Sequence, residues 1–182
     1  VVLLVDDQAI VAAALRQMLE AESDITFHYC GDPKRAIVDA LMLRPTVILQ
    51  DLVMPGVDGF SLLEQYRGNP ALDAVPVIIL SSQEDPLGKS PAFANGTIDY
   101  LVKIPDRIEL VARIRAYSQA YRVRAERDAA YRVLEELKLE LERKNAILLE
   151  LSEHDGLTGI ANRRRFDREL EFLGRDDDQV KL

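Results

Sequence analysis

Polar or reactive side chains follow the main apolar stretches of the sequence, at the point where each stretch ends. They are Asp6, Asp7, Asp51, Ser81 and Lys103. Carboxylates held close together repel one another unless a cation joins them, and hard oxygen ligands suit Mg²⁺. Asp51 can then act as a nucleophile and accept a phosphoryl group. Lys103 would place a positive charge beside the phosphoryl oxygens, and the Ser81 hydroxyl would donate a hydrogen bond to one of them. The residue types predict Mg²⁺-dependent phosphorylation of an aspartate.

These side chains meet only if the strands that precede them are parallel neighbours in one sheet. Apolar, β-branched runs predict five strands, at residues 1–5, 25–30, 46–51, 75–80 and 98–102. Helical spacing appears between the runs, and the fourth predicted helix covers residues 87–94. Asp32 with Pro33 marks one helix start, and either Asp58 or Ser61 marks another. Alternating strands and helices predict an α/β fold with a parallel sheet, which binds ligands at the carboxyl edge of its strands.

The composition argues against several classes of protein. A formal net charge of −8 and a pI near 4.9 disfavour a broad electrostatic surface for nucleic acid or anionic lipid. The single cysteine, Cys30, excludes an intramolecular disulfide and is expected to be a small core residue. No apolar run approaches the roughly 20 residues of a membrane span, so we expect a cytoplasmic protein. Because the first residue is Val rather than Met, we expect a fragment of a longer chain.

The sequence pattern changes from Asp106 onward. Neither Gly nor Pro occurs between Pro105 and Ser152, so one helix of about 45 residues and about 70 Å is predicted, extending beyond the α/β domain. A leucine seam interrupted by Lys144 runs along its second half, at Leu134, Leu137, Leu141, Leu148 and Leu151. We expect this helical stalk to form a homo-oligomer, a dimer, a tetramer or both, because a solitary helix would leave the seam in water.

Four segments contain the polar side chains named above: VDD at residues 5–7, QDLVMPGVDG at 50–59, IILSS at 78–82 and DYLVK at 99–103. Together they resemble the receiver domain of response regulators. The resemblance covers residues 1–120 and implies a flavodoxin-like (βα)5 fold with strand order 2-1-3-4-5, as well as a histidine kinase as phosphodonor. It implies that Asp51 is the phosphoacceptor and that the Mg²⁺ ligands are Asp6, Asp7, Asp51 and the backbone carbonyl of Val53. The residues that it implies contact the phosphoryl group or switch with it are Ser81, Lys103 and Tyr100.

Two positions depart from the pattern of that family. Ile104 separates Lys103 from Pro105, where the family usually has proline directly after the lysine, so a different local loop geometry is expected. Gln50 precedes the acceptor where an apolar or acidic residue is more usual, and we expect it to alter access to the phosphoryl group. Neither departure removes a reactive group.

The segment DGLTGIANRRRFD at residues 155–167 resembles the entry segment of GGDEF-type diguanylate cyclase domains. Such domains condense two GTP molecules into cyclic di-GMP, but the sequence contains no cyclase catalytic residue. The resemblance predicts three parts: a receiver at 1–120, a helical stalk at 106–152 and a cyclase fragment at 153–182, as in Wsp-type response-regulator cyclases. The leading hypothesis is a receiver whose phosphorylation controls stalk association and thereby a cyclase. A non-enzymatic adaptor is the alternative, and a transcription factor is disfavoured because the acidic C-terminal tail contains no basic recognition helix.

Overall fold

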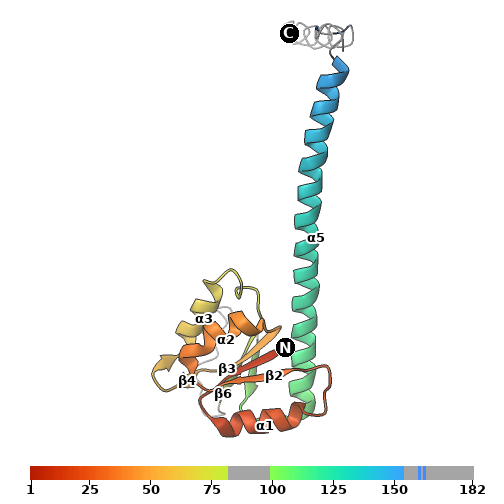
Figure 1. The fold of residues 1–182 in the computed structure, drawn as a ribbon. Helices are drawn as coiled ribbons and strands as arrows, with labels where there is room; N and C mark the ends of the chain where they lie inside the picture. Colours follow the sequence, from red (N-terminus) through yellow and green to blue (C-terminus); the bar gives the residue numbers. More distant parts are fainter. Residues whose placement is uncertain (82–98, 154–159, 161, 163–182) are drawn as a thin grey trace, which may run out of the picture. The chain divides into compact units, whose positions relative to one another are not determined.

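Five parallel strands form the central sheet of the computed structural model, which describes residues 1–81, 99–153, 160 and 162 (Figure 1). The strands are β1 (Val2–Val5), β2 (Phe27–Cys30), β3 (Val47–Asp51), β6 (Val77–Ser81) and β7 (Asp99–Val102). Their order in the sheet is β2-β1-β3-β6-β7, which is 2-1-3-4-5 when only these strands are counted. The predicted flavodoxin-like fold is therefore confirmed.

The helices follow the strands as predicted within the described residues. They are α1 (Ala9–Leu19), the 3₁₀ helix η1 (Pro33–Arg35), α2 (Ala36–Leu43), α3 (Gly59–Arg67) and α5 (Arg107–Glu153). The helix predicted at residues 87–94 lies outside the described residues. Asp58 caps α3, since its side chain accepts a hydrogen bond from the backbone N–H of Phe60 at 3.2 Å. Asp32 caps η1 in the same way through Lys34, so both predicted aspartate caps are present.

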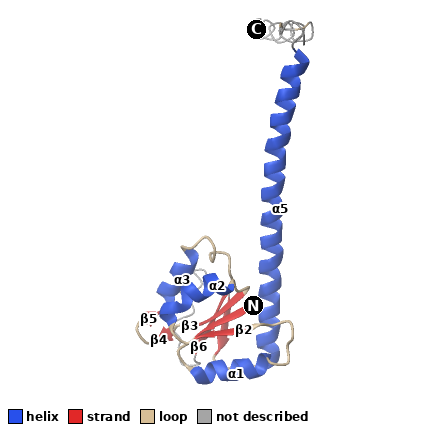
Figure 2. Cartoon of the chain, in the orientation of Figure 1, coloured by secondary structure: helices blue, strands red, loops and turns tan. Residues whose placement is uncertain are grey.

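Among the described residues, α2 and α3 cover one face of the sheet, and α1 and the beginning of α5 cover the other (Figure 2). Side chains alternate between the faces along each strand, so Leu3 and Ile48 pack beneath α2 and α3. Leu4 and Leu49 instead pack against α1 and the first turns of α5. Because both faces are covered, the strands are apolar almost throughout, as parallel strands require.

A small hairpin, which the sequence did not predict, lies between β3 and α3. Its antiparallel strands are β4 (Val53–Met54) and β5 (Val57–Asp58). Pro55 and Gly56 reverse the chain between them, and Gly56 has a φ of 74°, which glycine adopts without a steric cost. Strands of two residues are too short for an alternating pattern to reveal them, which is why the sequence did not predict the hairpin.

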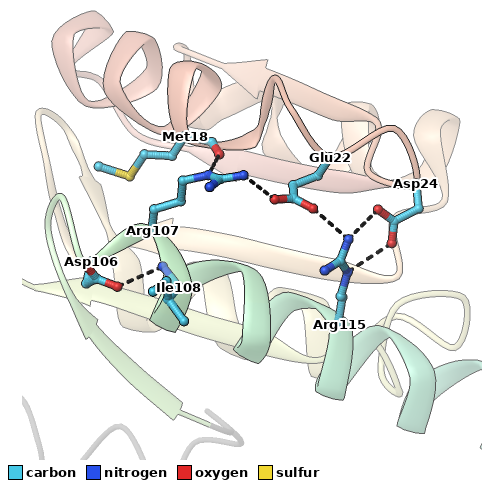
Figure 3. A network of polar contacts seen from close by, with 7 residues as sticks. All are labelled: Met18, Glu22, Asp24, Asp106, Arg107, Ile108 and Arg115. Carbon is cyan, nitrogen blue, oxygen red and sulfur yellow. Dashed lines mark hydrogen bonds and ion pairs between the residues drawn. The ribbon is translucent and has the colours of Figure 1, made fainter.

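Two arginines attach the beginning of α5 to the loop between α1 and β2 (Figure 3). Arg107 donates to the backbone carbonyl of Met18 at 2.9 Å and forms an ion pair with Glu22. Arg115 contacts the other carboxylate oxygen of Glu22 at 2.7 Å and both oxygens of Asp24. Glu22 therefore contacts two positions of α5 that lie eight residues apart, about two turns along the helix, which holds the helix against the domain.

The chain divides into two units after Glu126, and α5 continues through the boundary. α5 contains 47 residues, so the prediction of one long helix is confirmed. In the second unit Leu134, Leu137, Leu141 and Leu148 are all exposed, and the side chain of Leu151 lies outside the described part. The Lys144 ammonium lies 2.7 Å from the Glu140 carboxylate one turn earlier. Within the described ranges, no helix combines the length and apolar character needed to cross a membrane.

Candidate functional site

Three carboxylates meet at the carboxyl edge of the sheet. Asp6 follows β1, Asp51 ends β3, and these neighbouring strands are paired so that Val5 lies opposite Gln50. An oxygen atom from each of Asp6, Asp7 and Asp51 lies within 4.8 Å of the others. Asp6 and Asp51 are buried, whereas Asp7 is half-buried. The strand register thus brings together the acidic residues that the sequence predicted to converge.

Lys103 joins this group from the far side of β6. Its Nζ atom lies 2.6 Å from Oδ2 of Asp51 and 3.8 Å from Oδ2 of Asp6. The Lys103 side chain is largely buried, with 17% of its surface exposed. One ammonium faces three carboxylates, so the cluster keeps an excess of negative charge when the carboxylates are ionised.

The carboxylate oxygens fit a hard divalent cation. Oδ1 of Asp6 accepts a hydrogen bond from the Gln8 backbone N–H at 2.8 Å, but Oδ2 of Asp6 and Oδ1 of Asp7 have no hydrogen-bond partner. Burial raises the pKa of Asp6, and the neighbouring Asp51 and Asp7 raise it further, against the opposing effects of Gln8 and Lys103. Carboxylate oxygens that have no hydrogen-bond partner are well placed to bind a cation such as Mg²⁺, whose charge would offset the repulsion among them.

The backbone of Val53 lies beside the acidic cluster. Its N–H donates to Oδ1 of Asp51 at 3.3 Å, while its side chain points into solvent and is 72% exposed. The hairpin that contains Val53 therefore approaches the cluster through its backbone. A role for the Val53 carbonyl as a metal ligand stays a prediction.

Ser81 and Tyr100, the other two predicted site residues, lie on neighbouring strands. Ser81 ends β6, one residue after Leu80, which pairs with Asp51; its side chain lies outside the described part of the chain. Tyr100 is half-buried on β7, where its ring packs against the core beneath α2 and α3, and this burial raises its pKa. The switch roles of both residues stay predictions.

Asp99 is a polar anchor that the sequence did not reveal. Its carboxylate forms an ion pair with Arg113 and accepts a hydrogen bond from the Tyr117 hydroxyl at 2.9 Å. It also accepts a hydrogen bond from the backbone N–H of Tyr100 at 2.8 Å. Although partial burial raises the pKa of Asp99, the hydrogen bonds from these partners outweigh burial and lower it overall. Asp99 therefore ties the strand that carries Tyr100 to α5.

Ile104 has an unusual backbone conformation directly after Lys103. Its φ is 61°, in the left-handed region that β-branched residues rarely adopt, and its side chain is 49% exposed. The described residues contain no cis peptide bond. The loop after Lys103 was expected to differ from the family pattern. In the structure its peptide bonds are trans, and Ile104 has a strained, left-handed backbone conformation.

Gln50 has a different place from the one expected. Its side chain is completely buried, and its Nε2 atom donates to the backbone carbonyl of Gly59 at 2.8 Å. A side chain buried in this way does not line the approach to Asp51, so the expected effect on access does not fit the structure. Both faces of a parallel sheet are covered, so any side chain in the middle of β3 is expected in the core. This expectation was the sequence signal that Gln50 would be buried.

Cys30 is a buried core residue, as predicted. Its side chain is 3% exposed, and its thiol donates to the backbone carbonyl of Asp32 at 3.1 Å. Burial is the main cause that raises the pKa of the thiol to about 12. At neutral pH it is protonated and a poor nucleophile.

Comparisons with known proteins agree with this fold. The family model of the response regulator receiver domain matches residues 2–115. The chain is 32% identical over 173 residues to the transcriptional regulatory protein LiaR of Bacillus subtilis, covering 94% of this chain and 74% of LiaR. It is 33% identical over 115 residues to the DNA-binding response regulator MtrA of Mycobacterium tuberculosis, covering 63% of this chain and 49% of MtrA. The chain thus spans about half the length of MtrA.

Solved structures show the same fold. The receiver domain of the Francisella response regulator 1452 superposes with a TM-score of 0.58 at 31% identity, over 65% of this chain and 96% of that one. A response regulator from Desulfuromonas acetoxidans gives a TM-score of 0.58 at 29% identity over the same shares. Each of these matches covers about two thirds of the chain.

Proposed function

The chain belongs to the response regulator receiver family, and on this premise we propose that Asp51 is its phosphoacceptor and a histidine kinase its phosphodonor. The observation that carries the proposal is the pairing of Lys103 Nζ with Asp51 Oδ2 at 2.6 Å inside a cluster of three carboxylates. Asp51 lies at the end of a central strand, where its neighbours are positioned by rigid elements rather than by loops alone. A nucleophile in this setting is oriented before the phosphodonor arrives.

Asp6, Asp7 and Asp51 would hold the Mg²⁺ ion, together with the Val53 carbonyl. When bound, the ion offsets the charge of the carboxylates and of the phosphoryl oxygens. Asp51 attacks the phosphorus through a carboxylate oxygen, and the phosphodonor leaves with the electron pair of the bond that breaks. The Lys103 ammonium moves its contact from Asp51 to a phosphoryl oxygen, and the Ser81 hydroxyl donates to another. Buried Asp6 would contribute negative charge to the metal site, and the Gln8 N–H holds its Oδ1 in place.

The stalk is the element through which we propose that phosphorylation changes assembly. The exposed leucines of α5 would form a seam between copies of the chain, in a dimer or a tetramer. Such a row of apolar side chains loses its contact with water only when another helix covers it. The exposed Val133, Ile147 and Leu149 lie beside the seam and widen its apolar surface, which favours a bundle of more than two helices.

A diguanylate cyclase domain after the stalk is the output that we propose first. Its support is the segment at residues 155–167, most of which lies outside the described residues. Association of stalks would bring two cyclase domains together, each with one GTP, for condensation to cyclic di-GMP.

DNA binding is the second candidate output. LiaR, a transcriptional regulatory protein, aligns with 94% of this chain, well beyond the receiver. The gene sequence beyond Leu182 separates the outputs, because a cyclase requires a GGDEF-like motif and a transcription factor requires a basic recognition helix. Finding neither would favour the adaptor alternative.

The proposal that phosphorylation of Asp51 changes assembly is tested by measuring the mass of the chain in solution. The measurement is made with and without Mg²⁺ and beryllofluoride, which mimics a phosphoryl group. We expect the distribution of oligomers to change in the unaltered chain and to stay unchanged in Asp51→Asn. Transfer of labelled phosphate from a small phosphodonor should likewise disappear in Asp51→Asn. Labelling of the variant at the rate of the unaltered chain would refute the assignment of Asp51.

A further inference from the structure

We propose that Gln50 is a positioning residue for phosphorylation, which sets the β3–α3 loop against Asp51 by fastening the first residue of α3 to β3. This inference rests on the proposed function, because it names a further residue that the same reaction needs. Among the described residues, the Gln50 side chain forms no hydrogen bond with Asp6, Asp7 or Asp51. It would act through Gly59 and the hairpin between them.

Both backbone groups of Gly59 contact the end of β3. The Gly59 N–H donates to the carbonyl of Leu52 at 3.1 Å, and the Gly59 carbonyl accepts from Gln50 Nε2 at 2.8 Å. Residues 51–59 therefore form a loop whose two ends are held together by a pair of hydrogen bonds. The Gln50 bond is the only one of the two that depends on a side chain.

Only glycine at position 59 allows the start of α3 to lie so close to the backbone of Asp51 and Leu52. A Cβ atom there would lie 2.6 Å from Leu52 Cα and 2.9 Å from the carbonyl oxygen of Asp51. Both are backbone atoms, which cannot rotate away as a flexible side chain can. The start of α3 is thus packed directly against the backbone of the phosphoacceptor, and a change in one displaces the other.

Stability alone does not account for an amide at position 50. Gln50 is completely buried on the apolar face of the sheet, opposite Val5 on β1 and Ile79 on β6. Its Oε1 atom has no hydrogen-bond partner, which costs free energy inside a protein. An apolar side chain of similar volume would avoid that cost. The amide instead gives a specific geometry, through the one hydrogen bond that it makes.

The closed loop contains the groups whose placement matters for the reaction. Val53 donates to Asp51 Oδ1 at 3.3 Å and carries the carbonyl predicted to bind Mg²⁺. A metal ligand on a loose loop loses affinity, because the loop must be ordered when the metal binds. Closing the loop at Gly59 orders it in advance. Gln50 would in this way raise the affinity for Mg²⁺ and the rate of phosphorylation.

The test uses Gln50→Met in the full 182-residue chain, because methionine keeps the volume and removes the donor. Ile48→Val is the matched control, since Ile48 lies on the same strand and face but away from the loop. We expect titration calorimetry with MgCl₂ to show about three- to tenfold weaker binding in Gln50→Met, the effect of losing one hydrogen bond. The rate of labelling by acetyl phosphate should fall similarly, while the thermal unfolding temperature stays equal or rises. Ile48→Val should show the opposite pattern, with a lower unfolding temperature and unchanged Mg²⁺ affinity.

Gln50→Asn provides a second variant if the methionine variant does not fold. It keeps the amide but is one carbon shorter, so we expect the same loss of Mg²⁺ affinity. Mg²⁺ affinities within twofold of the unaltered chain in the folded Gln50 variants would overturn this inference and leave the proposed function standing. Absence of Mg²⁺ binding and of labelling in the unaltered chain would refute both. Weaker binding in Ile48→Val to the same extent as in Gln50→Met would also overturn the specific role of Gln50.

Discussion

The ammonium of Lys103 lies 2.6 Å from Oδ2 of Asp51, across 52 positions of sequence. Lys103 Nζ also lies 3.8 Å from Asp6 Oδ2, so one positive charge is shared between two buried carboxylates. Under the proposed function, Lys103 both stabilises the resting cluster and releases its contact with Asp51 when Asp51 is phosphorylated, and the two effects can be separated experimentally.

Replacing Lys103 with methionine should have opposite effects on metal binding and on reaction. Removal of the ammonium leaves the carboxylates more negative, so we expect Mg²⁺ to bind about threefold more tightly or better. Labelling of Asp51 by acetyl phosphate should become slower, because the phosphoryl oxygens lose a cationic partner. Calorimetry and labelling rates measure the two effects, with Lys138→Met on the exposed helix as the control. Weaker Mg²⁺ binding in Lys103→Met would contradict the proposed arrangement of charges.

Replacing Ile104 with glycine should stabilise the protein. Ile104 has a φ of 61°, and glycine adopts this conformation without the clash of a β-branched side chain. We expect the free energy of unfolding in urea to rise by about 0.5–1 kcal/mol. Ile108→Gly is the matched control, because it makes the same change inside the first turn of α5 and should destabilise by about 1 kcal/mol. A loss of stability in Ile104→Gly would show that the side chain contributes more than the strain costs.

The attachment of α5 to the loop between α1 and β2 should depend on Glu22 more than on Asp24. The Glu22 side chain is 16% exposed and contacts both Arg107 and Arg115, whereas that of Asp24 is 57% exposed and contacts only Arg115 among the ion pairs of the described residues. We expect Glu22→Ala to lower the free energy of unfolding by about 1 kcal/mol, since it leaves two guanidinium groups without their shared partner. Asp24→Ala should have a smaller effect in the same urea titration. Equal effects would argue against the bridging role of Glu22.

Asp99→Asn should change how stability depends on pH. The pKa of Asp99 is lowered in the folded protein, so folding favours its ionised form. This contribution is complete above the unfolded pKa of about 3.9 and is lost as the pH falls through the lower folded pKa. At neutral pH we expect the free energy of unfolding of the unaltered chain to exceed that of Asp99→Asn by about 1–2 kcal/mol. This difference in unfolding free energy should shrink below about pH 4. Urea unfolding at several pH values measures it, and the exposed Glu64→Gln should show little difference.

Replacing Lys144 with leucine should strengthen self-association of the stalk. Lys144 interrupts the predicted leucine seam and pairs with Glu140 at 2.7 Å, so each copy would have to bury or displace a charge on association. A continuous seam should tighten association at least about tenfold, as expected for burying one leucine per copy. Analytical ultracentrifugation measures the change. Arg132→Leu is the control, because residue 132 lies two positions before Leu134 and so on another side of the helix; a similar gain there would argue against the seam.

Much of the fold could be predicted because its signals are local. The apolar runs of β1, β3 and β6 are continuous, as strands covered on both faces must be, and Asp58 and Asp32 are recognisable as helix caps from the residues around them. The absence of Gly and Pro after Pro105 was enough to predict α5. In contrast, the β4–β5 hairpin was missed, because its strands contain two residues each.

The sequence by itself determined which chemical groups stand at the ends of the strands, and therefore that carboxylates and a lysine would share one edge of the sheet. Parallel strands align their ends, so this conclusion needs only their order. Tertiary structure decided which atoms pair: Lys103 with Asp51, Asp99 with Arg113, and Gln50 with Gly59. A hydrogen bond forms over a few tenths of an ångström, and such distances depend on strand register, rotamers and helix docking together. For that reason the hydrogen bond from Gln50 to Gly59 could not be predicted from the sequence, because it depends on how α3 packs against β3.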